Sequence, residues 1–172
     1  FRNIFESISV QEVNDLSDAL NNGCHLTVID IRANVSATKA DRYFQIRPGT
    51  DYAFNLAVIH ELVYRGLYDK DYAERFIADL DTLKQFVAGY TPEWAERETG
   101  ISAARIAEFA GQLAKDAPSV IWHPGWMMAR YAHTFYLCRS IYIINALLGS
   151  IGARGGLPLV SKPKDAGRNG LK

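Results

Sequence analysis

Residues 25–51 read HLTVIDIRANVSATKADRYFQIRPGTD, and this stretch decides the fold. It opens at 26–29 with an apolar, β-branched run that is short enough for a buried strand. A second short strand is predicted at 43–46. Asp30 follows the first strand, and Asp51 follows the second strand after a Pro-Gly turn. In a parallel sheet both acids would lie at one edge, where open α/β sheets bind their ligands.

Carboxylates at such an edge suit a nucleotide. They accept hydrogen bonds from ribose hydroxyls or from the N1–H and amino group of a guanine. Residues 33–39 are small and polar, so we predict a loop that passes over the strand end. Thr50 is a candidate N-cap for a helix that ends at Gly66. Asp51 also has a structural interpretation, because an acid in the first turn of a helix stabilises it by roughly 0.3–1 kcal/mol.

The composition is that of a folded domain without a charge bias. Of 172 residues, 48% are hydrophobic and 22% are charged, so the chain can bury a sizeable core. Lys plus Arg and Asp plus Glu number 19 each, and this balance argues against a protein that binds nucleic acid or a membrane surface. No signal peptide is recognisable, and the chain starts at Phe1 without a Met. We therefore expect a piece of a larger protein.

No metal site is predicted from the residues themselves. Cys24 and Cys138 are too few and too isolated for a zinc or iron–sulfur site. Asp41 and Asp69 are predicted to act as turn and cap residues. The histidines lack metal-ligand spacing, and we predict structural roles for all four of them: His25, His60, His123 and His133.

The rest of the chain is mainly helical in pattern. A third strand is predicted at 119–122, and the helix at about 131–148 is apolar nearly all round, so we expect it to be deeply buried. Four glycines between 149 and 156 permit a tight turn. Further helices are predicted at 11–21, once or twice within 69–89, after Thr91 and after Ser102. The core candidates within 69–89 are Tyr72, Phe76, Leu80, Leu83, Phe86 and Val87.

Several short motifs, in order, resemble the molybdopterin oxidoreductase (dimethyl sulfoxide reductase) family. Each motif is weak alone, but the ordered series covers nearly the whole chain. The segment WHPGW at 122–126 most resembles the thiosulfate and polysulfide reductase branch. The other motifs are IDIR at 29–32, AD at 40–41, IRPGTD at 46–51, GLYD at 66–69, YTPEWA at 90–95, TGI at 99–101 and LGSIGARGG at 148–156.

The resemblance implies a fold and a cofactor. We expect an α/β, Rossmann-like three-layer domain with a mainly parallel sheet over 1–156, incomplete in this chain, and an irregular tail over 157–172. The cofactor would be molybdenum held by two molybdopterin guanine dinucleotides, with a [4Fe-4S] cluster elsewhere in the polypeptide. The cofactor contacts carried over by position are Asp30, Ile31, Arg32, Ala33, Asn34, Gly49, Thr50, Asp51 and Trp126.

Arg130 is the candidate catalytic residue, since in this branch an arginine near the metal would hold an anionic sulfur substrate. The resemblance also implies the remaining domains of the same chain, an iron–sulfur electron-transfer subunit and a membrane anchor as partners. Family likeness further implies a periplasmic or membrane-associated location and a role in anaerobic respiration. Arg130 in a surface ion pair and Trp126 as a core aromatic residue are the structural alternatives.

Two other functions stay open at this point. The first is a standalone Rossmann-like nucleotide-binding module without redox chemistry. The second is a formate dehydrogenase of the same family. A cysteine-rich segment upstream would favour a molybdenum enzyme, whereas an initiator Met just before Phe1 would favour the standalone module.

Overall fold

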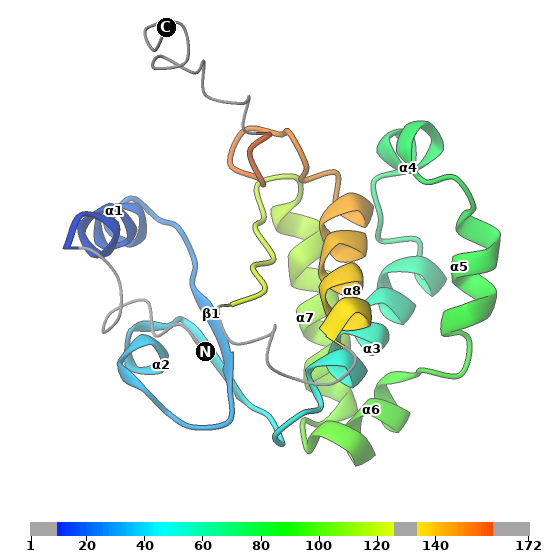
Figure 1. Cartoon of the computed structure of the whole chain (residues 1–172), viewed down its shortest axis with the longest axis horizontal. Helices are drawn as coiled ribbons and strands as arrows, with labels where there is room; N and C mark the ends of the chain where they lie inside the picture. Colours follow the sequence, from blue (N-terminus) through cyan, green and yellow to red (C-terminus); the bar gives the residue numbers. More distant parts are fainter. Residues whose placement is uncertain (1–9, 126–133, 160–172) are drawn as a thin grey trace, which may run out of the picture.

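The computed structural model describes residues 10–125 and 134–159, which form a helix-rich α/β fold (Figure 1). In this view two short strands lie between α1 and α2 on one side and a bundle of helices on the other. The elements of the described part are α1 (Val10–Asn21), β1 (Thr27–Asp30), α2 (Val35–Lys39), β2 (Arg42–Gln45), α3 (Asp51–Tyr64), α4 (Lys70–Phe76), α5 (Leu80–Val87), α6 (Pro92–Thr99), α7 (Ala103–Asp116) and α8 (Thr134–Leu147).

The two strands from the 25–51 stretch pair in parallel, as the sequence predicts. Thr27 lies opposite Arg42, and Asp30 lies opposite Gln45. Each strand is shifted by one residue from its predicted bounds. Residues 33–39, predicted as a loop, are partly helical. The prediction was wrong there because Asn34 is an N-cap whose Oδ1 accepts from the N–H of Ala37 at 2.9 Å, which starts α2.

The predicted strand at 119–122 does not form, and the sheet of the described residues has two strands. The backbone N–H and C=O of Trp122 bind the side chain of Asn145 instead of a neighbouring strand. Pro118 also lacks an N–H to donate to a ladder. The described part is therefore helix-rich with a small parallel sheet, rather than built on a mainly parallel sheet.

Helix α3 lies at the centre of the bundle and packs against α5, α6, α7 and α8. It begins after a Pro-Gly turn and ends before Gly66, whose φ is +64°. Nearly every residue from Phe54 to Val63 is buried, because neighbours cover the helix on several sides. This helix therefore fixes the orientation of the loop that precedes it.

An aromatic cluster joins the sheet to the bundle. Its members are Phe44 of β2, Phe54 of α3, Phe109 of α7 and Trp122. The Phe44 ring lies 5.5 Å from Phe54 and 5.0 Å from Phe109, between centroids. Trp122 lies 6.2 Å from Phe54 and 5.7 Å from Phe109. Burial of these four rings holds the strand ends against the N-terminal half of α3.

Other predicted features are confirmed in part. Thr91 caps α6 through its side chain, Gly100 ends that helix at φ +80°, and Asp69 caps α4. Thr50 and Ser102 occupy the N-cap positions of α3 and α7, as predicted, but neither side chain makes a capping hydrogen bond. The region 69–89 holds two helices, α4 and α5.

Some large apolar residues of the outer helices that were predicted to be buried are exposed. Phe76 is 68% exposed and Phe86 is also exposed, because α4 and α5 lie at the edge of the bundle (Figure 1). Helix α8 is buried on one side only, and Phe135, Tyr136 and Tyr142 lie on its exposed side. No helix of the described part is both long and apolar enough to cross a membrane.

Candidate functional site

Two loops leave the same edge of the two-stranded sheet. Residues 31–34 follow β1, and residues 46–50 follow β2 and lead into α3. Because the strands are parallel and Asp30 lies opposite Gln45, both loops start at neighbouring points. The backbone N–H of Ile46 donates to the carbonyl of Asp30 at 3.1 Å, which holds the two loop origins together. The structure thus brings together the two loops that carry most of the predicted cofactor contacts.

Asp30 is 1% exposed, and its carboxyl group faces its own loop. Its Oδ1 accepts from the backbone N–H of Arg32 at 2.9 Å, and its Oδ2 accepts from the side-chain amide of Asn34. Burial raises the pKa of Asp30, and the backbone N–H groups of Arg32 and Ile31 oppose this effect. Asp30 therefore organises the loop, and the carboxyl group itself is not presented on the surface.

The loop residues that follow Asp30 are accessible to solvent. Ile31, Arg32 and Ala33 are exposed, and Asn34 is half-buried. The side-chain amide of Gln45 donates to the carbonyl of Ile31 at 3.3 Å, which fixes the loop from the neighbouring strand. The loop therefore offers its backbone, and the Arg32 side chain, to anything bound at this edge.

The second loop ends in a helix N-terminus without a side-chain cap. The hydroxyl of Thr50 donates to the carbonyl of Arg47 at 2.8 Å, so it does not close the first turn of α3. Gly49 has φ +78° and open space where a Cβ would lie. Backbone N–H groups at the start of a 14-residue helix, together with its dipole, favour an anion such as a phosphate.

Asp51 lies half-buried at the first position of α3. Burial raises the pKa of its carboxyl group. The backbone N–H of Asp51 itself opposes this effect through a hydrogen bond to the carboxyl group. Partial burial of the charged carboxylate lowers the stability of the folded protein, and the exposed part of the group is accessible to a ligand.

Arg47 helps to hold the second loop in place, a role that was not predicted from the sequence. Its guanidinium donates to the carbonyls of Arg97 and Glu98 at the end of α6, and its backbone N–H donates to the carbonyl of Thr99 at 3.0 Å. Arg47 therefore anchors the second loop to the bundle. Its position in the IRPGTD motif was visible, but its partners lie about fifty residues away in sequence, so the motif alone did not reveal the role.

Trp126 and Arg130 lie outside the described residues, and their predicted roles stay predictions. The described part of the chain before them ends at Gly125. There the backbone N–H of Gly125 donates to Nδ1 of His123 at 3.0 Å. This bond makes a turn at Gly125, whose φ is +74°. His123 thus has a structural partner on one ring nitrogen.

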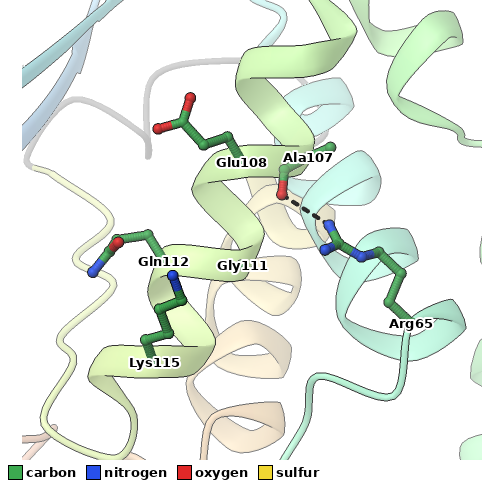
Figure 2. Close-up of a pocket in the computed structure, with 6 residues that line it drawn as sticks. All are labelled: Arg65, Ala107, Glu108, Gly111, Gln112 and Lys115. Carbon is green, nitrogen blue, oxygen red and sulfur yellow. Dashed lines mark hydrogen bonds between the residues drawn. The ribbon is translucent and has the colours of Figure 1, made fainter.

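A shallow surface hollow of about 350 Å³ lies between α3 and α7 (Figure 2). Arg65 reaches into it, but its guanidinium binds the carbonyl of Ala107 and the carboxylate of Glu61, each at 3.0 Å. The lining mixes both signs of charge and includes none of the predicted site residues. It consists of Arg65, Ala107, Glu108, Gly111, Gln112 and Lys115.

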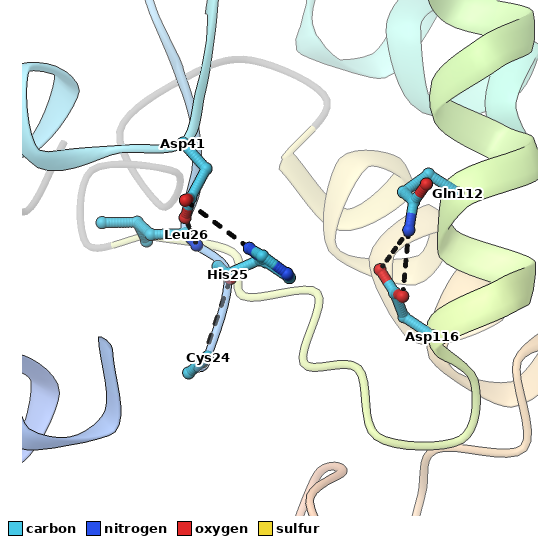
Figure 3. A network of polar contacts seen from close by, with 6 residues as sticks. All are labelled: Cys24, His25, Leu26, Asp41, Gln112 and Asp116. Carbon is cyan, nitrogen blue, oxygen red and sulfur yellow. Dashed lines mark hydrogen bonds and ion pairs between the residues drawn. The ribbon is translucent and has the colours of Figure 1, made fainter. Parts of the chain in front are cut away.

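The opposite end of the strands is closed by a small polar clasp of exposed residues (Figure 3). Asp41 accepts from the backbone N–H of Leu26 at 2.7 Å and lies 3.5 Å from Nδ1 of His25. The Leu26 N–H, followed by His25, lowers the pKa of Asp41. These contacts confirm Asp41 as a structural residue. No cluster of three or more possible metal ligands occurs among the described residues.

Comparison with known proteins gives the family. No family model matches the chain. It is 34% identical to the thiosulfate reductase molybdopterin-containing subunit PhsA of Salmonella typhimurium over 155 residues. This match covers 90% of the chain and 20% of PhsA. Over 77% of the chain it is 30% identical to the arsenate respiratory reductase molybdopterin-containing subunit ArrA of a Shewanella species, of which this is 18%. The chain belongs to the molybdopterin oxidoreductase family.

The structure agrees with this family assignment. The fold resembles acetylene hydratase from Pelobacter acetylenicus with a TM-score of 0.76 and 31% identity, over 82% of this chain and 19% of that protein. The chain thus spans about a fifth of the length of these relatives. PhsA and ArrA are each named as a subunit, so these relatives work within assemblies.

The strand-end edge fits the phosphate-bearing cofactor of this family. The accessible backbone of residues 31–33, the N-terminus of α3 without a side-chain cap and the open space at Gly49 suit phosphate groups. The half-buried Asp51 suits a donor such as a hydroxyl or an amide N–H. Asp30 and Arg47 hold the two loops in position.

Proposed function

We propose that this chain is the part of a molybdenum-dependent reductase that binds the nucleotide portions of its cofactor, in an enzyme acting on thiosulfate or polysulfide. The main support is that two loops leave one edge of a parallel sheet, next to a helix N-terminus without a side-chain cap and a half-buried carboxylate. The similarity to PhsA over 90% of the chain supports the choice of substrate class.

The cofactor in this proposal is molybdenum with two molybdopterin guanine dinucleotides. When bound, it supplies the two-electron chemistry of the reduction. The backbone of residues 31–33 and the first turn of α3 hold phosphate groups, and Asp51 accepts hydrogen bonds from a ribose or guanine. Asp30 acts indirectly, because its carboxyl group fixes the loop that makes the contact.

Arg130 is proposed to hold the anionic substrate, and Trp126 to contact the cofactor. A guanidinium suits an oxyanion because its planar fork can donate two parallel hydrogen bonds. Both residues follow the turn at Gly125.

The wider context belongs to the same proposal. In the complete enzyme, further strands would extend the two-stranded sheet into a three-layer Rossmann-like domain. A [4Fe-4S] cluster elsewhere in the polypeptide, an iron–sulfur subunit and a membrane anchor would deliver electrons during anaerobic respiration. The location would be periplasmic or membrane-associated.

Metal and nucleotide analysis of the full-length protein tests this function. We expect one molybdenum and two guanine nucleotides per protein, and reduction of thiosulfate or polysulfide with a viologen dye as electron donor. Tetrathionate in the same assay tests a neighbouring substrate, and formate is tested separately by its oxidation with the oxidised dye as electron acceptor. Activity with formate alone would replace the substrate assignment, and nucleotide binding without molybdenum would support a standalone nucleotide-binding module instead.

A further inference from the structure

The side chain of Asn145 in α8 is fully buried and forms hydrogen bonds with the backbone of Trp122, which is distant in sequence. Its Oδ1 accepts from the N–H of Trp122 at 3.0 Å, and its Nδ2 donates to the carbonyl of Trp122 at 2.9 Å. Nδ2 also donates to the carbonyl of Ile141 within α8, at 3.0 Å. We call this pairing of Asn145 with the Trp122 backbone the Asn145 clamp.

The clamp supplies the backbone hydrogen bonds that a neighbouring strand would otherwise make with Trp122. Residues 119–125 have no strand partner in the described part of the chain, so the buried peptide groups of Trp122 need another partner. The amide of asparagine has one acceptor and one donor side, which matches a peptide N–H and C=O. The indole of Trp122 is fixed separately, by its stacking on Phe54.

The clamp lies just before the segment that carries the proposed substrate residue. Trp122 is the last buried residue before the turn at His123 and Gly125, and residues 126–133 follow. We infer that Asn145 is a positioning residue, which sets where the chain leaves the core at Trp122, just before the stretch of sequence that carries Trp126 and Arg130. This inference rests on the proposed function and assigns Asn145 no contact with the substrate.

An Asn145→Leu variant of the full-length enzyme tests the inference, because leucine has a similar size and cannot bind the Trp122 backbone. Asn55→Leu is the matched control. Asn55 is also buried and donates to the hydroxyl of Ser140 at 2.9 Å, so the same substitution removes a buried bond between α3 and α8 without touching Trp122. Asn145→Ala and Asn55→Ala form a second pair if the leucine variants do not fold.

Two measurements are compared between each pair. By hydrogen-exchange mass spectrometry, we expect the peptide covering 119–125 to exchange at least about tenfold faster in the Asn145 variant alone, since the Trp122 N–H loses its partner. We expect the KM for thiosulfate to rise about tenfold or more, with kcat and molybdenum content within about twofold of the control, because misplacement of a binding group weakens substrate binding.

The outcomes separate the clamp from the proposed function. Unchanged exchange at 119–125, or faster exchange with a KM equal to that of the Asn55 control, would overturn the positioning role while leaving the proposed function intact. A wild-type enzyme without molybdenum, or with no thiosulfate turnover, would overturn the proposed function and with it this role for Asn145.

Discussion

At the scale of single residues, the two aspartates at the strand ends behave differently despite their similar positions in sequence. Asp30 is sealed under its own loop and has two partners on its carboxyl group. Asp51 is half-buried, and burial is the largest effect on its pKa, which it raises. Only Asp51 therefore combines a destabilising environment with access for a ligand, which is typical of functional residues.

The substitution Asp51→Asn should stabilise the cofactor-free protein at neutral pH. Burial raises the folded-state pKa above the ordinary 3.8, so the folded protein binds the proton more tightly than the unfolded chain. The free energy of unfolding therefore falls as the pH rises from 3.8 through the raised pKa, and this loss persists at pH 7. Thermal melts from pH 3 to 8 should show a gain for the variant at pH 7 that disappears below pH 3.8.

The same variant should retain less cofactor in the full-length enzyme. Asparagine has one acceptor oxygen where aspartate has two, and its NH2 group donates instead of accepting. Lower stability at pH 7 would contradict the assigned environment of Asp51. Normal molybdenum and guanine content would remove Asp51 from the cofactor site.

Arg130→Lys should raise the KM for thiosulfate about tenfold while the cofactor stays bound, because an ammonium group cannot reproduce the two parallel hydrogen bonds of a guanidinium. Steady-state kinetics and molybdenum analysis of the same preparation measure both quantities. Unchanged kinetics would return Arg130 to the alternative of a surface ion pair.

At the scale of the helices, two caps that look alike in sequence differ in the structure. The hydroxyl of Thr91 accepts from the N–H of Trp94 at 3.3 Å, whereas the hydroxyl of Ser102 does not cap α7. The N–H of Ala103, at the start of α7, instead donates to the carboxylate of Glu96 at 2.9 Å. A sequence motif for an N-cap thus predicts the helix start better than it predicts the bond.

This difference predicts unequal effects of removing the two hydroxyls. Thr91→Ala should lower the free energy of unfolding by about 1 kcal/mol, because α6 loses its cap. Ser102→Ala should change it by less than about 0.5 kcal/mol, as at an ordinary surface position. Urea unfolding of both variants gives the comparison, and equal losses would show that Ser102 caps α7 after all.

At the scale of the whole molecule, the sheet and the bundle are held together by the aromatic cluster around Phe44. Phe44 is 1% exposed and contacts both α3 and α7. The guanidinium of Arg105 lies over its ring, 4.7 Å from the centroid, and donates to the carbonyl of Tyr43 at 3.0 Å. The position of the strand-end loops therefore depends on this contact between β2 and the helices.

Phe44→Ala should lower the free energy of unfolding by about 3–5 kcal/mol, since it removes a large buried ring at the junction. Phe76→Ala is the matched control, because Phe76 is 68% exposed and its loss should cost less than about 1 kcal/mol. Denaturant titrations followed by circular dichroism measure both. A small loss at Phe44 would mean that the sheet is not coupled to the bundle.

Short-range patterns in the amino-acid sequence were enough to predict the local elements and the family. Parallel strands at the 25–51 stretch, the helix after Asp51, the cap at Thr91 and the two helices within 69–89 follow from patterns spanning a few neighbouring residues. The ordered motifs pointed to the family, and the 34% identity to PhsA over 90% of the chain agrees with it. The roles of the predicted site residues stay predictions.

Tertiary structure alone decided which polar groups are used and where. It buried the carboxyl group of Asp30, left Asp51 half-buried, and replaced a predicted third strand with the Asn145 clamp. It also tied Arg47 to α6. The physical reason is that a buried peptide or carboxyl group without a partner costs free energy, so the fold supplies partners for most of them. Those partners lie as many as fifty residues away in sequence, beyond the reach of any local pattern.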